Sequence, residues 1–195
     1  PDEQAVFRRL GVFVNGFTLQ FAQEVAADDQ IDRWAVLDLL GHLVDRSLVV
    51  ADGDDVPRYR LLETMRTFAL EKLAAAGETQ VFLRRHAEAL LAFLTPLDEQ
   101  RWKALPADQI RVGADLDNLR AALDWAESAA GDRKFACALI GCSSSLWLAH
   151  GQLNEGIERA LAMLPLAESV APEVEARFNL FLGTVGYLGP RHECL

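Results

Sequence analysis

The stretch from Ser47 to Ala76, SLVVADGDDVPRYRLLETMRTFALEKLAAA, decides the fold of this chain. Two short strand-like runs, Leu48–Val50 and Tyr59–Leu61, flank a turn that begins at Asp52-Gly53, and a strongly patterned helix follows. An Asp-Gly turn between apolar runs is the strongest short-range signal for a β-hairpin. Because a two-stranded hairpin alone is marginal in water, this one must pack on the neighbouring helices.

The residues before the hairpin predict three short helices. Thr18 and Asp32 are placed to cap the second and the third of them. The third helix has a buried stripe at helical spacing, formed by Val36, Leu37, Leu40, Leu43 and Val44. Gly41 lies inside this helix, where it costs about 1 kcal/mol relative to alanine, and we interpret it as a sign of close packing. Three helices, one hairpin and a fourth helix within residues 1–77 predict a winged-helix domain.

From residue 78 onward the pattern predicts helices alone. Their expected ranges are 79–94, 115–128, 135–150, 153–164 and 172–185. Short turns such as Gly131-Asp132 and Gly151-Gln152 separate them, as in antiparallel helical hairpins. The small or apolar positions of a tetratricopeptide-like (TPR-like) repeat after Gly151 are occupied by Gly156, Ala160 and Met163. The fold class is therefore mainly α, with a winged-helix domain at 1–77 and a TPR-like helical-hairpin domain at 78–195.

The composition narrows the class of protein. The 195 residues are 51% hydrophobic, enough to bury a core, and the formal net charge is −10. This charge argues against broad attraction to nucleic acid or to an anionic membrane surface. No apolar run approaches the roughly 18 residues of a membrane helix, and no signal-peptide pattern occurs. The three cysteines form no even set, which indicates a reducing, cytoplasmic location.

Several blocks of the sequence, taken in order, resemble one family. They are GVFVNGFTL (11–19), VLDLLGHLVDRSLVV (36–50), RYRLLETMRTFALEKL (58–73), RRHAEALLAFL (84–94) and DLDNLRAALDWA (115–126). In this order they resemble bacterial signalling ATPases of the STAND class, which are related to NB-ARC proteins and often described as LuxR- or AfsR-type transcriptional regulators. The resemblance implies a nucleotide-binding domain upstream in the same chain as the partner of the winged helix. It also implies a non-catalytic regulatory segment that relays the state of that domain to a helical sensor region.

The sequence departs from this family at the nucleotide site. It has no GxxxxGK[ST] phosphate loop, so we expect neither enzyme activity nor an ATP or ADP cofactor in this segment, and both are implied only for the parent protein. Many family members carry Met-His-Asp after the wing, with a histidine that contacts the ADP phosphate. The corresponding run here is Leu61-Leu62-Glu63, and leucine cannot donate that hydrogen bond. We favour a local role for Glu63 at the helix N-terminus, where the helix dipole favours a carboxylate, and keep Leu61, Leu62 and Glu63 as a relay site toward the nucleotide-binding domain as the alternative.

The third helix is also a candidate recognition helix, since winged helices often bind DNA. Residues 1–76 contain 8 Lys and Arg against 13 Asp and Glu, a net charge of −5. Phosphate contacts supply most non-specific affinity, so this charge argues against DNA as a partner. Arg58 and Arg60 on the wing are interpreted as a solvated strand face. A DNA-binding module of a transcription factor stays as the alternative function.

No group of residues has the spacing of a catalytic or metal site. The four histidines lie in different segments, and Cys137 and Cys142 are expected to be buried structural thiols. The remaining candidates are the aromatic residues of the helical half, Trp125, Trp147, Phe181 and Tyr187. We interpret them as core between hairpins or, alternatively, as a surface for a protein or peptide partner, which would make this half a binding scaffold.

The ends of the chain lead to one more expectation. The sequence begins at Pro1 and stops in mid-pattern, which indicates a piece of a longer protein that is truncated at its C-terminus. Apolar side chains such as Phe178 would then be left uncovered. Because exposed apolar patches favour association, we expect self-association through this end.

Overall fold

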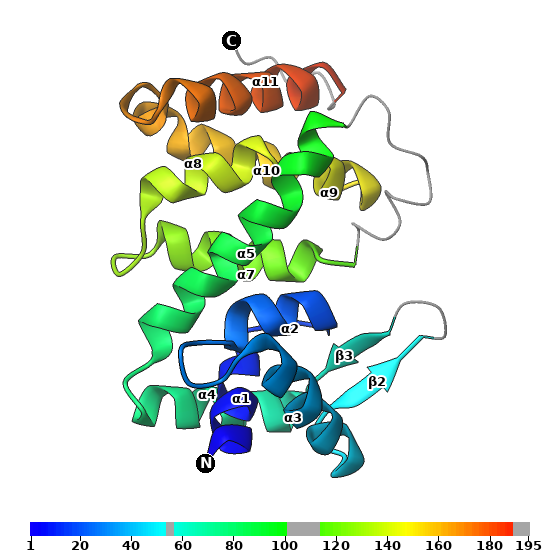
Figure 1. Cartoon of the computed structure of the whole chain (residues 1–195). Helices are drawn as coiled ribbons and strands as arrows, with labels where there is room; N and C mark the ends of the chain where they lie inside the picture. The colour runs from blue at the N-terminus through cyan, green and yellow to red at the C-terminus, as the bar shows by residue number, and fades with distance from the viewer. Residues whose placement is uncertain (54–56, 101–113, 189–195) are drawn as a thin grey trace. The chain divides into compact units, whose positions relative to one another are not determined.

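The computed structural model describes residues 1–53, 57–100 and 114–188 (Figure 1). In these ranges the chain is mainly helical, with a small antiparallel sheet in its N-terminal part. The chain divides into two compact units, Pro1–Ala89 and Leu90–Leu195. The long helix α5 (Thr79–Glu99) contributes residues to both units.

Unit 1 has the architecture of a winged helix. Before α5 its elements are α1 (Asp2–Leu10), β1 (Phe17–Thr18), α2 (Leu19–Ala26), α3 (Arg33–Asp45), β2 (Val50–Asp52), β3 (Arg58–Arg60) and α4 (Glu63–Ala75). Helix α1 packs against α2, α3 and α4 and is the central helix of this unit (dark blue in Figure 1). The order of helices, hairpin and further helix confirms the predicted fold class.

The predicted caps explain where two of these helices begin. Thr18 accepts a hydrogen bond at Oγ1 from the amide of Phe21, at 3.2 Å. Asp32 accepts one at Oδ1 from the amide of Ala35, at 2.8 Å. A side-chain oxygen at the N-cap satisfies an amide that the first helical turn leaves without a partner. The starts of α2 and α3 can therefore be read directly from the sequence.

The sheet has three strands, in the order β1-β3-β2, where the sequence predicted a hairpin alone. Phe17 pairs with Tyr59 across β1 and β3, and Ala51 pairs with Tyr59 across β2 and β3. A strand as short as β1 shows no alternation of apolar and polar residues, so no sequence pattern predicts it. Strand β2 begins at Val50, later than expected, because the amides of Leu48 and Val49 both donate to the carbonyl of Leu43.

Unit 2 is built from helices in the residues that the structure describes. After the second part of α5 its elements are α7 (Leu116–Glu127), α8 (Arg133–Gly141), α9 (Ser144–Ala149), α10 (Leu153–Met163), the 3-10 helix η1 (Leu164–Ser169) and α11 (Pro172–Leu188). Helix α8 packs against α7, α10 and α11, so it is the central helix of unit 2.

Two helices of this region differ from their predicted ranges. The helix expected over 135–150 is interrupted at Cys142-Ser143, where Ser143 Oγ donates to the carbonyl of Ile140 at 2.8 Å and accepts from Trp147 Nε1 at 2.9 Å. Helix α5 continues through Pro96 to Glu99, although it was expected to end at Leu94. Proline removes one backbone donor without preventing the next hydrogen bonds, and the amide of Gln100 donates to the carbonyl of Pro96.

None of the helices in the described ranges combines the length and the hydropathy that a membrane-spanning segment needs.

Candidate nucleic-acid interface

Helices α2 and α3 form the helix-turn-helix of unit 1, and the turn between them is held rigidly. Asp28 Oδ1 accepts hydrogen bonds from the amides of Gln30 and Ile31, at 2.9 and 2.8 Å. Burial tends to raise the pKa of Asp28, but these amides and the guanidinium of Arg9 outweigh it and lower that pKa. The carboxylate is therefore held in its charged form and accepts both hydrogen bonds of the turn.

Arg9 fastens this turn from the side of α1. Its guanidinium donates to the carbonyl of Ala26 at 2.7 Å and to Asp28 Oδ2 at 2.5 Å, and it lies 4.7 Å from the centre of the Phe82 ring. The residue is buried, and a buried charge is stable only when it is paired in this way. The helix-turn-helix is thus pre-formed rather than assembled on contact with a partner.

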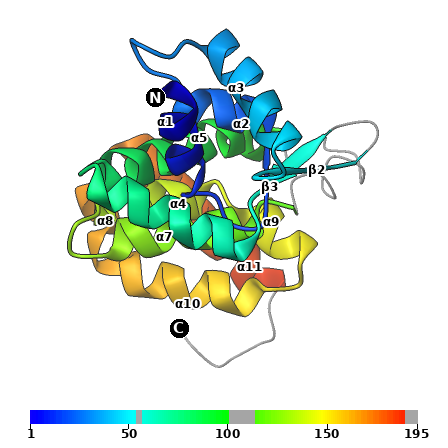
Figure 2. The same cartoon turned by 90° about the horizontal axis from the view of Figure 1, so that it is seen from below.

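Helix α3 divides into a buried and an exposed face. Val36, Leu40 and Leu43 are buried against the rest of unit 1. The exposed positions within α3 are Arg33, Trp34, Asp38, Gly41, His42 and Asp45. The wing strands β2 and β3 extend from the C-terminal end of this helix (Figures 1 and 2). Helix and wing therefore form the kind of surface that helix-turn-helix proteins lay on DNA.

The arginines near this surface already have partners. Arg33 lies 2.7 Å from Glu24, Arg46 lies 2.7 Å from Glu3, and Arg60 lies 2.8 Å from Asp52. Arg58 donates to the carbonyl of Gly16 at 3.2 Å. Exposed ion pairs of this kind contribute roughly 0–1 kcal/mol each, so a phosphate group can replace the carboxylate.

Comparison with known proteins identifies the class of this domain. Residues 1–74 match the family model of the winged helix-turn-helix domain. No solved structure matches the chain. Residues 1–74 are therefore a winged helix-turn-helix domain, in agreement with the fold.

The relatives extend beyond this domain. Over 159 residues the chain is 42% identical to a Mycobacterium tuberculosis H37Rv protein provisionally named HTH-type transcriptional regulator Rv0890c, and to its Mycobacterium bovis counterpart Mb0914c. The alignment covers 80% of this chain but 18% of the length of those relatives. The chain is also 39% identical over 90 residues to the uncharacterized protein Rv0894 of M. tuberculosis H37Rv, which covers 45% of this chain and 23% of that protein.

These findings correct the prediction that DNA is not a partner. The winged helix-turn-helix match and the similarity to proteins named as transcriptional regulators point to DNA binding. The net charge of −5 over residues 1–76 led to the wrong conclusion because it measures attraction to phosphate averaged over the whole surface. Sequence-specific recognition depends on base-edge contacts from a few side chains, which a total charge does not describe.

The predicted relay residues lie at the start of α4. Leu62 occupies the N-cap position without a side-chain cap and is 44% exposed, and Glu63 is the first residue of the helix. Glu63 lies 3.6 Å from Arg66 one turn later. No described contact reports on an upstream domain, so the relay role of Leu61, Leu62 and Glu63 stays a prediction.

Three of the four aromatic candidates of unit 2 lie in its core. Trp147 is fully buried, and Trp125 and Phe181 are 8% and 2% exposed. The side chain of Tyr187 lies outside the described residues. A partner cannot reach side chains with this burial, so the structure adds no support for a partner surface built from them. Phe178, expected to be uncovered, is fully buried as well.

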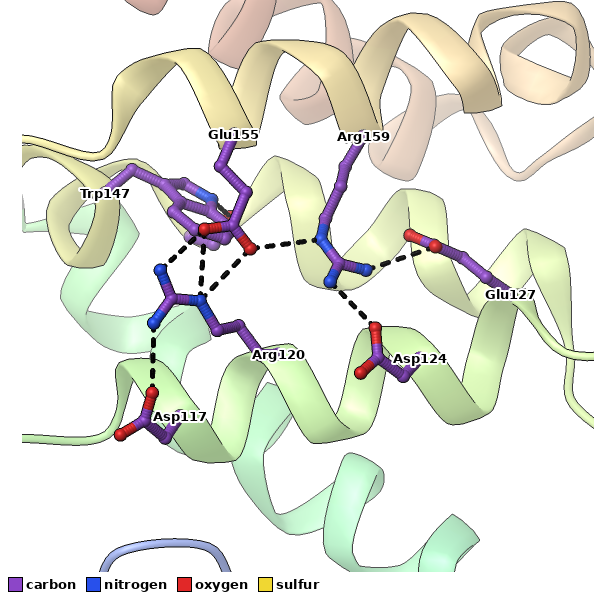
Figure 3. Close-up of polar contacts among 8 residues, drawn as sticks. Asp117, Arg120, Asp124, Glu127, Trp147, Glu155 and Arg159 are labelled. Atoms are coloured by element: carbon purple, nitrogen blue, oxygen red, sulfur yellow. Dashed lines mark hydrogen bonds and ion pairs between the residues drawn. The ribbon is translucent and has the colours of Figure 1, made fainter.

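Sequence reasoning missed a network of ion pairs between α7 and α10 (Figure 3). Arg120 on α7 lies 2.6 Å from Glu155 on α10, and Arg159 on α10 reaches back to Asp124 and Glu127, at 2.7 and 3.1 Å. Hydrogen bonds from Arg120 lower the pKa of Glu155, so its carboxylate stays charged. The Glu155–Arg159 spacing of four residues was the available signal, but the partners on α7 are distant in sequence.

The arrangement of this network indicates a structural role. Its carboxylates and guanidinium groups pair with one another and cross-link two helices. In the part of the chain that the structure describes, no group of three or more His, Cys, Asp or Glu side chains could hold a metal ion. Cys137 and Cys142 are buried free thiols, and burial raises the pKa of each.

Proposed function

We propose that this chain is the DNA-binding regulatory segment of a longer transcriptional regulator, and that its winged helix contacts the DNA. The observation that carries this proposal is the pre-formed α2–α3 helix-turn-helix with its wing, inside a segment that matches the winged helix-turn-helix family over residues 1–74. The 42% identity to proteins named as regulators supports the same role.

In this proposal α3 enters the major groove and the wing contacts the neighbouring backbone. Arg60 on β3 is 41% exposed at its side chain, and a phosphate would replace Asp52 as its partner. Arg33 at the start of α3 would exchange Glu24 for a phosphate in the same way. The pre-formed turn means that binding requires no folding of the recognition helix.

The direct test is selection from a pool of randomised duplexes by the 195-residue chain at low salt, followed by fluorescence anisotropy with the enriched duplex. We expect one sequence to be enriched, and Arg60→Ala to weaken its binding several-fold. Arg84→Ala is the matched control, because Arg84 forms an exposed ion pair of the same 2.8 Å length with Glu88 on α5, away from the wing. Failure to enrich any duplex would overturn the proposal.

We further propose that the parent protein is a STAND-type ATPase, in which this segment relays the state of the nucleotide-binding domain. Two observations support this finer role. The sequence blocks between residues 11 and 126 resemble that family, and the chain spans 18% of the length of its regulator relatives, which leaves room for other domains in those proteins. The TPR-like reading of the helical half is supported by the burial of Gly156, Ala160 and Met163.

Hydrogen–deuterium exchange in the parent protein tests the relay. If it exists, the amides around Leu61–Glu63 should change their exchange rate when ATP replaces ADP. Calorimetry on the 195-residue chain alone should detect no nucleotide binding. Identical exchange in both nucleotide states, or binding of ATP by the chain itself, would exclude the relay role without affecting the DNA-binding proposal.

A further inference from the structure

The exposed face of α3 carries side chains that phosphate attraction does not explain. Trp34, Asp38, Gly41 and Asp45 recur at helical spacing and are all exposed. Trp34 is 75% exposed, the highest value among the large apolar side chains of the described residues. An exposed tryptophan leaves a large apolar area in contact with water, and binding to another molecule would cover that area. Two of the other positions are carboxylates, which phosphate repels.

Gly41 lies in the middle of this face, and packing does not require a glycine there. A Cβ atom added at Gly41 would meet no other atom within 4 Å, and the residue is exposed. The expectation of close packing is therefore wrong. Glycine inside a helix costs about 1 kcal/mol relative to alanine, and here nothing in unit 1 requires that cost. Because Gly41 has no side chain, another molecule can come close to the backbone of α3.

The chemistry of the other positions fits base edges in the major groove. A carboxylate accepts a hydrogen bond from the N4 amino group of cytosine, and an apolar side chain contacts the methyl group of thymine. Trp34 and Asp38 lie one turn apart, which is a rise of about 6 Å along the helix. Base pairs follow one another every 3.4 Å or so, therefore the two side chains reach bases about two steps apart.

We propose that Trp34 and Asp38 are specificity-determining residues that read thymine and cytosine in the major groove, with Gly41 allowing α3 to lie close to the bases. This inference rests on the proposed DNA-binding function and adds which bases are read. Both residues belong to the first half of α3, and the N-terminal residues of a recognition helix are the ones that reach base edges. Arg33, the residue before Trp34, is paired with Glu24 and would contact a phosphate of the DNA backbone instead of a base.

The test for Asp38 starts from the duplex enriched by the unaltered chain. Asparagine pairs with adenine through its N6 and N7, so Asp38→Asn should move the preference at one position from cytosine to adenine, by about tenfold in relative affinity. Glu71→Gln on α4 removes the same charge from an exposed position outside the interface and should leave the base preference unchanged.

The test for Trp34 uses deoxyuridine, which lacks only the methyl group of thymine. Replacing the contacted thymine should weaken binding by the unaltered chain about fourfold, the value of one buried methyl or methylene group. The same replacement should have no effect on Trp34→Ala. Because Trp34 is exposed, this variant should fold normally, which thermal unfolding checks. DNA binding that is identical with and without Trp34 would assign the face to another kind of partner and overturn the proposal.

The test for Gly41 separates binding from stability. Gly41→Ala should weaken DNA binding although it should stabilise the fold. Gly183→Ala on α11 is its matched control, since Gly183 is also a helical glycine with no atom within 4 Å of an added Cβ. Enrichment of no duplex at all would mean that the proposed function fails. An enriched duplex whose base preference is unchanged by Asp38→Asn and by deoxyuridine would mean that this inference fails while the function stands.

Discussion

Helix α3 carries both a glycine and a tryptophan, and a glycine on α10 faces a tryptophan on α9; the two pairs differ in burial. On α10, a Cβ at Gly156 would lie 2.9 Å from ring atoms of Trp147, and that tryptophan is fully buried. On α3, Gly41 has open space around it and Trp34 is 75% exposed. Gly156 is explained by packing inside its own unit. Gly41 has no such explanation, which is why we look outside the chain for one.

The largest expected difference in the free energy of unfolding is between the two tryptophan truncations. Trp147→Ala should lower the free energy of unfolding by about 3–5 kcal/mol, because it opens a cavity in the core of unit 2. Trp34→Ala should change it by no more than about 0.5 kcal/mol, as is usual for an exposed position. Urea unfolding of both variants measures the difference. Similar losses would mean that the two tryptophans are not distinguished by burial.

The next effect concerns the buried glycine. Gly156→Ala should destabilise the fold by about 1–3 kcal/mol, because the new methyl group overlaps the indole of Trp147 and overpacking is costly. The higher helix propensity of alanine offsets part of this loss. Trp147→Ala removes the ring atoms that the new methyl group would meet, so a double-mutant cycle should show coupling between positions 147 and 156. Additive losses would contradict the contact.

Gly41→Ala should have the opposite sign. With open space around an added Cβ, alanine should raise the free energy of unfolding by about 0.5–1 kcal/mol through helix propensity alone. Urea unfolding of the 195-residue chain, followed by circular dichroism, measures this gain. A loss of stability would show that Gly41 has a structural role after all.

The smallest effect is a pH dependence of the network between α7 and α10. Arg120 lowers the pKa of Glu155 below its usual 4.5, so the contribution of this carboxylate is complete above about pH 4.5 and is lost as the pH falls through the folded-state pKa. For a partly exposed pair we expect about 0.5 kcal/mol. Glu155→Gln should reduce the loss of stability against urea when the pH falls from 7 to well below 4.5. Glu158→Gln, an exposed residue on the same helix, should not.

Local chemistry explains which parts of the fold could be predicted from the sequence. Thr18 and Asp32 cap helices through contacts with residues three positions later, and such contacts are visible in the sequence itself. Strand β1 depends on pairing with β3, which is distant along the chain, and its short length leaves no pattern. The break at Cys142-Ser143 coincides with a hydrogen bond from the indole of Trp147 to Ser143 Oγ, a side-chain contact that periodicity does not report.

The candidate site was harder to predict than the fold. The sequence predicts α3 and its buried stripe, but the net charge of residues 1–76 argued against DNA contacts by the exposed face of α3. Whether Gly41 is packed or open is a question about neighbours in space, and the sequence alone suggested the wrong answer. Trp34 was not singled out, because it lies next to the buried stripe and nothing in the residue string distinguishes its exposure.

If the winged helix contacts DNA as proposed, its paired arginines have a consequence for how the protein would search for its binding site. An arginine that gives up a carboxylate when it meets a phosphate exchanges one anion for another, as for Arg60 and Asp52. The net gain from releasing the counterions of DNA is then smaller than for an unpaired cation. Affinity for random sequence should be low and should vary little with ionic strength. Such a regulator would dwell only briefly on unrelated DNA and would depend on base contacts to remain at its site.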